Sequence, residues 1–213
     1  DTIPDVGVFP AQLAHDVPCD LECQGTLNLK LATCNVLSLK PGKPGTQSAP
    51  EHLTVGPSRQ DSLLAQFDDE GVHIFAWQET RLRKASNRHD ERYWLFRSPA
   101  NAQGHYGMLI GIHRTLPIGI VDHGKQESEV FIQEHEVAVV ATTPRFMILR
   151  VKNPLLRCLV ITGHAPHTGA EPDIIRDWWH SVASAIPAPY SHWQCILLVD
   201  ANARIGAEPN AHV

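Results

Sequence analysis

Short apolar runs along the chain alternate with polar and turn-forming segments, a pattern typical of an α/β protein. In residues 27–35, leucines alternate with Asn28 and Lys30, which predicts a half-buried strand that ends at Asn35. The apolar run from Cys195 to Val199 is typical of a strand buried on both faces. Further strands are predicted at residues 72–77, 106–113, 118–121, 135–143, 145–151 and 157–162.

Two segments have the apolar spacing of amphipathic helices. Ser58 can cap a helix that runs to about Glu70, where Gly71 ends it. A second helix is predicted over residues 172–185, with a proline at its start. We expect its tandem tryptophans, 178 and 179, to supply the core and rim of the helix rather than a base-stacking platform.

The chain has 213 residues, 43% of them hydrophobic, which is enough for one sizeable core. We expect residues 1–26, which contain several prolines, to form an extended N-terminal arm or linker, and residues 27–213 to form one domain. No apolar run approaches the ~20 residues needed to cross a bilayer, so no membrane span is expected. Because the net charge is -5, any nucleic-acid contact must use a local basic patch.

The five cysteines are an odd number, which argues against a disulfide framework. Cys34, Cys158 and Cys195 lie in strand-like runs, so we expect buried, reduced thiols and an intracellular location. Cys19 and Cys23 have no second Cys/His pair nearby, so a structural zinc is not expected.

Polar side chains follow four of the predicted strands at the point where each strand ends. They are Asn35, Glu79, His164 and the pair Asp200 and Asn202. Residues two apart on a strand point the same way, so Asp200 and Asn202 are expected to face one side together. An Asp/Asn turn after a strand is also common, but four such endings predict convergence at one sheet edge, where ligand sites of layered α/β folds lie. Carboxylate and amide oxygens there can hold Mg²⁺.

An arginine-rich stretch begins directly after Glu79, with Arg81, Arg83 and Lys84. Such a stretch is typical of a solvated loop, and also of a surface that contacts phosphates. In the second interpretation, Tyr93 and Trp94 are available for stacking on bases.

Five short motifs occur in the order and spacing of one known family. Together they resemble the endonuclease/exonuclease/phosphatase superfamily, which has the fold of deoxyribonuclease I and of the exonuclease III-type AP endonucleases. Segments 163–166 and 199–206 most resemble the endonuclease domains of retroelement polyproteins. The five motifs are Thr33-Cys34-Asn35-Val36, Gln78-Glu79-Thr80, Tyr106-Gly107-Met108, His164-Ala165-Pro166-His167 and Asp200-Ala201-Asn202.

The resemblance implies a DNase I-like four-layer α/β/β/α sandwich that hydrolyses phosphodiester bonds in DNA with Mg²⁺, or with Mn²⁺ in its place. Glu79 would be the main metal ligand, and Asn35 would help to position the metal or its water. His164 would contact the scissile phosphate. Asp200 and Asn202 would orient the nucleophile and stabilise the transition state.

Contacts to the nucleic-acid backbone are also expected from residues near these motifs. Arg81 stands where the family often has lysine, and Arg83, Lys84 and His167 are further candidates for phosphate contact. A retroelement origin would imply a nuclear location. RNA tails, inositol phosphates and sphingomyelin are alternative substrates, because the fold alone does not choose among them.

The sequence departs from the family at two places. The family's last motif, Ser-Asp-His, supplies a general base and is absent from the 213 residues, and Leu37 stands where an acidic residue is frequent. We therefore expect the domain to be incomplete at its C-terminal end. The alternative function is a catalytically inactive nuclease fold that serves as a binding or structural subunit, with a protein partner covering the incomplete sheet edge.

Overall fold

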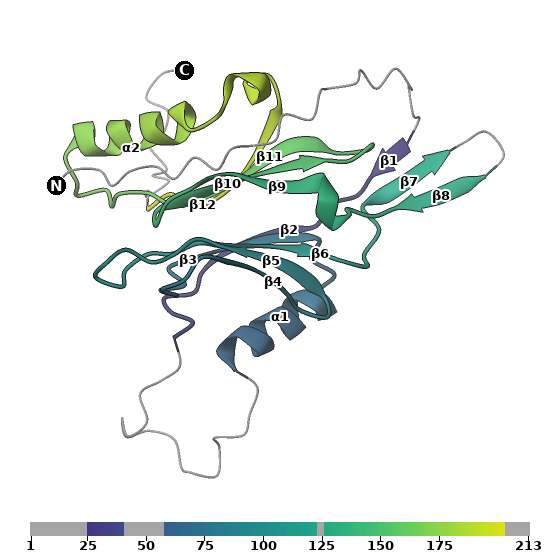
Figure 1. Ribbon diagram of the computed structural model, residues 1–213, viewed down its shortest axis with the longest axis horizontal. Helices are drawn as coiled ribbons and strands as arrows, with labels where there is room; N and C mark the ends of the chain where they lie inside the picture. The colour runs from purple at the N-terminus through teal and green to yellow at the C-terminus, as the bar shows by residue number, and fades with distance from the viewer. Residues whose placement is uncertain (1–24, 41–57, 123–125, 203–213) are drawn as a thin grey trace, which may run out of the picture.

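Two β-sheets pack face to face, with α1 (Arg59–Asp69) on the outer side of one and α2 (Pro172–Ser184) on the outer side of the other (Figure 1). The computed structural model describes residues 25–40, 58–122 and 126–202. The mixed α/β class predicted from the sequence is confirmed. Within the described ranges, neither helix is long and apolar enough to cross a membrane.

The five-stranded sheet has the strand order β2-β3-β6-β5-β4. β2 and β3 run parallel, with α1 between them in the chain, and the remaining neighbours pair antiparallel. The strands are β2 (Leu31–Asn35), β3 (Ile74–Gln78), β4 (Ser86–His89), β5 (Tyr93–Arg97) and β6 (Leu109–His113).

The four-stranded sheet has the strand order β12-β11-β10-β9. β11 and β12 run parallel, with α2 between them in the chain, while β9 and β10 form a hairpin. The Thr143 hydroxyl closes the hairpin turn, since it accepts hydrogen bonds from the backbone N–H groups of Arg145 and Phe146. The strands are β9 (Val137–Thr142), β10 (Phe146–Lys152), β11 (Arg157–His164) and β12 (Gln194–Asp200).

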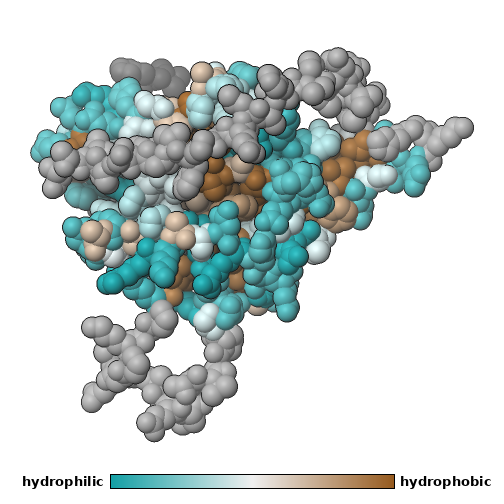
Figure 2. All heavy atoms as spheres, viewed as in Figure 1, coloured by the Kyte–Doolittle hydropathy of each residue, from teal (hydrophilic) through white to brown (hydrophobic). Residues whose placement is uncertain are grey.

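A small third sheet projects beside the two large ones (Figure 1). It contains β1 (Gly25–Leu27), β7 (Gly119–Asp122) and β8 (Glu127–Val130) in the order β1-β7-β8. Figure 2 shows hydrophobic atoms exposed on this projection, where Leu27 and Ile120 are exposed. Two short 3₁₀ turns complete the described elements, at Glu134–Glu136 and Ala188–Tyr190.

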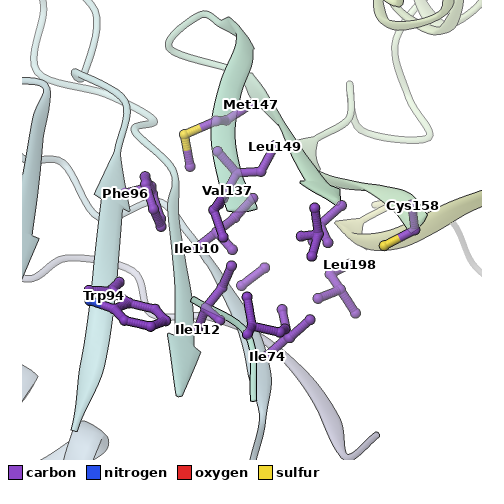
Figure 3. Close-up of a cluster of buried hydrophobic side chains, with 14 of the residues drawn as sticks. Ile74, Trp94, Phe96, Ile110, Ile112, Val137, Met147, Leu149, Cys158 and Leu198 are labelled. Atoms are coloured by element: carbon purple, nitrogen blue, oxygen red, sulfur yellow. The ribbon is translucent and has the colours of Figure 1, made fainter. Parts of the chain in front are cut away.

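Three layers of apolar side chains hold these elements together. Figure 3 shows the central layer, in which β3, β5 and β6 face β9 to β12 across the space between the sheets. A second layer packs α2 on the four-stranded sheet, and a third packs α1 on the five-stranded sheet. The central layer includes Ile74, Trp94, Phe96, Ile110, Ile112, Met147, Leu149, Cys158 and Leu198.

Both helices agree with the sequence predictions. Ser58 caps α1 in a capping box with Asp61, and Gly71 follows the helix with a φ of +65°, which glycine adopts at low cost. In α2, Trp178 is buried and Trp179 lies at the rim, 37% exposed.

The predicted strand over residues 27–35 is confirmed over residues 31–35, where β2 ends at Asn35, but its start is wrong, because residue 27 belongs to β1 in another sheet. Asn28 donates its backbone N–H to Ile118, and the backbone N–H of Lys30 donates to His73, so the chain leaves one sheet and enters another between these bonds. β1 starts at Gly25, inside the segment expected to be an arm. Residues 1–24 lie outside the described residues, so the division into an arm and a domain stays a prediction.

Three burial predictions are also wrong. Tyr93 and Trp94 are buried in β5, so neither is available to stack on a base. Cys34 and Cys195 are exposed free thiols, whereas Cys158 is buried as expected. β12 is not buried on both faces, since it is an edge strand of its sheet and Leu197 is 51% exposed.

Candidate functional site

The polar residues predicted at the strand ends lie together in space. Asn35 ends β2, Glu79 follows β3, His164 ends β11 and Asp200 ends β12. Each sheet contributes one parallel pair, in which Asn35 is level with Gln78 and His164 is level with Asp200. Parallel strands bring their carboxyl ends to the same edge. We call Asn35, Glu79, His164, Asp200 and Asn202 the strand-end cluster.

One amide group joins the two sheets at this edge. The Nδ2 of Asn35 donates to Glu79 Oε1 at 3.0 Å and to Asp200 Oδ2 at 2.8 Å. The amide cannot turn freely, because its Oδ1 accepts the backbone N–H of Leu37 at 3.0 Å. Two carboxylates from different sheets are therefore held against one donor.

Glu79 is kept ionised by its neighbours. Burial raises the pKa of Glu79, but hydrogen bonds from Asn35 and Arg81 and the positive charge of Arg81 outweigh burial and hold the pKa below 4.5. The Arg81 Nη2 lies 2.7 Å from Glu79 Oε2. Arg81, predicted to contact a phosphate, is thus paired with the predicted metal ligand.

His164 is held in one tautomer by Asn202. The amide Nδ2 of Asn202 donates to the Ala165 carbonyl at 2.7 Å and lies 3.2 Å from His164 Nε2, so Nε2 accepts and Nδ1 carries the proton. That Nδ1 lies 3.4 Å from Asp200 Oδ2 and 3.8 Å from Glu79 Oε1. The ring therefore presents an N–H toward the carboxylates.

The surroundings of His164 favour its neutral form by lowering its pKa. Burial lowers the pKa of His164 and the charge of Arg145 lowers it further, whereas Asp200 and Glu79 raise it, and the net pKa lies below 6.5. The short distances to the carboxylates are consequently contacts of a neutral ring rather than ion pairs. A neutral imidazole can donate one hydrogen bond to a phosphate without adding charge.

Backbone strain is concentrated around the strand-end cluster. Among the described residues, every non-glycine residue with a positive φ belongs to the segments around this edge. Such conformations cost about 1–3 kcal/mol each and gather at functional sites. The five residues are Leu37 (+58°), Glu79 (+56°), Arg81 (+56°), Tyr106 (+62°) and Asn202 (+46°).

The sequence did not predict the role of Gln78 beneath the cluster. Its Nε2 lies 3.0 Å from Thr33 Oγ1, 3.0 Å from Thr162 Oγ1 and 2.9 Å from the Leu198 carbonyl. Gln78 is 1% exposed and links β3 to both strands of the other parallel pair. The available signal was a polar residue near the end of each of three strands: Thr33 two residues before Asn35, Thr162 two residues before His164, and Gln78 directly before Glu79.

Arg145 is a second residue that the sequence did not indicate. Its guanidinium carbon lies 4.9 Å from the centroid of the Tyr106 ring, and that ring lies 5.6 Å from the His164 ring. Arg145 lies in the β9–β10 turn, and its position near Tyr106 and His164 follows only from the packing of that turn on the other sheet.

The remaining predicted contacts do not join the cluster. Arg83 and Lys84 are exposed in the segment between β3 and β4, and His167 is exposed after β11, where its Nδ1 accepts the backbone N–H of Gly169. In the described part of the chain, none of these three contacts the strand-end cluster. Their contact with a phosphate stays a prediction.

The chemistry of the cluster suits a hard divalent cation. Mg²⁺ prefers carboxylate and carbonyl oxygens and keeps several waters. Glu79 and Asp200 share one amide donor, but among the described residues only Glu79 has a permanently charged partner, Arg81, so a divalent cation would neutralise the remaining charge. The described ranges contain no group of three His, Cys, Asp or Glu arranged around a metal, so waters would complete the ligands.

A cavity of about 400 Å³ opens between the edges of the two large sheets, away from β2 and β12. Of the strand-end cluster, no residue lines it. Its lining residues are Ala85, Ser86, Asn87, Arg97, Val139, Thr142 and Met147.

The fold and the site define a mixed α/β protein with a carboxylate, amide and imidazole cluster at one edge of two facing sheets. No family model matches the sequence, and no curated protein matches it. Among solved structures, the chain is similar to the endonuclease domain of TRAS1, a telomere-specific non-LTR retrotransposon. The two are 13% identical with a TM-score of 0.40, and the match covers 68% of this chain and 53% of that one.

Proposed function

We propose that this chain is a DNase I-like domain that hydrolyses phosphodiester bonds in DNA with Mg²⁺, or Mn²⁺ in its place. The observation that carries the proposal is the Asn35 amide between Glu79 and Asp200, with the Asn202-oriented ring of His164 beside them. The order of layers, with a helix outside each of two facing sheets, supports a four-layer sandwich.

The residues of the chain suggest a division of work. Glu79 would hold the cation, which when bound supplies Lewis-acid charge to a phosphate oxygen, and Asn35 would orient the Glu79 carboxylate through its Nδ2 rather than ligate the metal, since its Oδ1 accepts the Leu37 N–H. Arg81, whose Nη2 lies 2.7 Å from Glu79 Oε2, would contact the phosphate beside the cation. His164 would contact a non-bridging phosphate oxygen.

Hydrolysis joins a water oxygen to phosphorus and breaks one P–O bond, and a base must take the proton of the water. In the family that this chain resembles, a Ser-Asp-His motif supplies that base. The 213 residues contain no such motif. We therefore assign to this chain the groups that bind the metal and the phosphate. Asp200 and Asn202 would orient the attacking water.

A second candidate function is a non-catalytic subunit that binds a protein partner. It is favoured by β2 and β12, which lie against each other and have no outer neighbour among the described strands. Leu31 and Leu197 are exposed on these two edges, at 39% and 51%. Unpaired edge strands are surfaces that other chains can cover.

Nicking of supercoiled plasmid DNA in Mg²⁺ tests the proposed hydrolysis. Glu79→Gln removes the charge that would hold the cation, so its rate is expected to fall by about 100-fold or more. Glu91→Gln, an exposed acidic residue outside the cluster, is the matched control and is expected to nick like the wild type. Equal nicking by wild type and Glu79→Gln, or nicking that persists without a divalent cation, contradicts the proposal.

A further inference from the structure

The β9–β10 turn is fixed against the strand-end cluster through its backbone. The Arg145 carbonyl accepts the backbone N–H of His164 at 2.8 Å. The carbonyl of the preceding residue, Pro144, accepts the backbone N–H of Gly107, in the loop before β6, at 2.8 Å. Arg145 is thus placed by two hydrogen bonds next to the ring that would meet the scissile phosphate.

Its side chain rests on a rigid platform. The guanidinium lies over the Tyr106 ring at 4.9 Å, a distance suited to a cation–π contact. Tyr106 itself has a φ of +62°, and its carbonyl accepts the N–H of Arg81 at 2.8 Å, so the platform is held by the segment that follows Glu79. The ring orients the guanidinium without using any of its N–H donors.

The guanidinium of Arg145 has no anionic partner within the described ranges. Its Nε is buried and makes no hydrogen bond there, and no carboxylate of those ranges forms an ion pair with it. Its charge nevertheless lies close to the site, because the Tyr106 ring beneath it is 5.6 Å from the His164 ring. A guanidinium has five donors in a planar fork that matches a phosphate.

We propose that Arg145, oriented by Tyr106, binds a non-scissile backbone phosphate of the nucleic-acid substrate beside the strand-end cluster. This proposal rests on the proposed function, because the ligand is a phosphodiester of that substrate. Arg145 is then a substrate-binding residue of this chain that sets where the backbone lies. Tyr106 is a positioning residue, which acts through the guanidinium that it supports.

Binding of a fluorescently labelled 12-base-pair DNA duplex to the full chain, in Ca²⁺ at a series of salt concentrations, tests this assignment. Arg145→Gln is expected to weaken binding on the order of tenfold. It should also reduce the slope of log K against log salt by about 0.9, the contribution of one phosphate contact. Arg145→Lys keeps the charge, so it should retain the slope while losing part of the affinity.

Arg150→Gln is the matched control. Arg150 lies on β10, roughly 16 Å along the strand from Arg145, between two residues that face the opposite sheet, and its Nε also has no partner among the described residues. The variant is expected to bind like the wild type. The assignment is overturned if Arg145→Gln has the same slope of log K against log salt as the wild type. It is also overturned if Arg150→Gln loses as much binding affinity as Arg145→Gln.

Two further outcomes separate the possible failures. Tyr106→Phe is expected to bind like the wild type and Tyr106→Ala to bind like Arg145→Gln, because only the ring is needed. Full binding by Tyr106→Ala overturns the role of Tyr106. No binding by the wild type rejects the proposed function together with this inference, whereas wild-type binding that Arg145→Gln leaves unchanged rejects the inference alone.

Discussion

Single polar side chains at the strand ends are oriented by the backbone around them. Asn35 is fixed by the N–H of Leu37, and Asn202 by the carbonyl of Ala165. Both amides then orient a neighbour that carries the chemistry, the carboxylates in one case and His164 in the other. Groups held in this way need little reorganisation when a ligand arrives.

His73 makes the stability of the fold depend on pH. Its Nδ1 accepts the backbone N–H of Lys30 at 3.0 Å, so the other nitrogen carries the proton and donates to the Pro117 carbonyl at 3.1 Å. Burial is the largest cause that lowers the pKa of His73 below 6.5, although the bond to Pro117 opposes it. Protonation therefore favours the unfolded chain, whose histidine titrates near its ordinary pKa.

We expect the free energy of unfolding, measured by urea titration, to decrease between pH 7.5 and pH 5.5. The stabilising contribution of neutral His73 is complete above about pH 6.5 and is lost as the pH falls below that value. His73→Gln should flatten this dependence, and His192→Gln, an exposed position, should leave it unchanged. An equally steep decrease in His73→Gln would show that other groups cause it.

At the scale of elements, the two large sheets are connected by Gln78 as well as by apolar packing. This side chain reaches from β3 to Thr33 on β2, to Thr162 on β11 and to the Leu198 carbonyl on β12. The bonded residues lie one or two positions before the strand-end cluster in their strands. They therefore keep the ends of β3, β11 and β12 level.

Replacing Gln78 with leucine should destabilise the protein by about 1–3 kcal/mol, because the Leu198 carbonyl and two hydroxyls lose a buried partner. Gln194→Leu, an exposed position at the start of β12, is the control and is expected to change stability by about 0.5 kcal/mol or less. Urea unfolding measures both variants. A Gln78→Leu protein as stable as the wild type would show that the bonds to Gln78 contribute nothing.

The elements that the sequence predicted well are those whose signals are local. Ser58 and Gly71 bound α1, and Thr143-Pro144 marks the hairpin between β9 and β10. The strand expected over residues 27–35 is present only over residues 31–35, because bonds to distant residues, such as His73, redirect the chain before Leu31. The apolar run of β12 looked fully buried because a sequence does not show which strand lies at a sheet edge.

At the scale of the whole molecule, the strand-end cluster could be predicted because two parallel pairs end at one edge. That rule places Asn35, Glu79, His164 and Asp200 without knowledge of their contacts. Arg145 could not be found in this way, since it lies in a hairpin turn that reaches the cluster only when the two sheets stack. The spacing of apolar residues along one strand does not predict which residues of another layer that strand contacts.

The central claim is that the strand-end cluster binds a divalent cation, and titration of the full chain with Mn²⁺, followed by electron paramagnetic resonance, tests it most directly. The wild type is expected to bind one Mn²⁺, and Glu79→Gln to bind it at least about tenfold more weakly. Glu91→Gln should retain wild-type affinity. The claim is contradicted if the wild type binds no Mn²⁺, or if wild type and Glu79→Gln bind it equally.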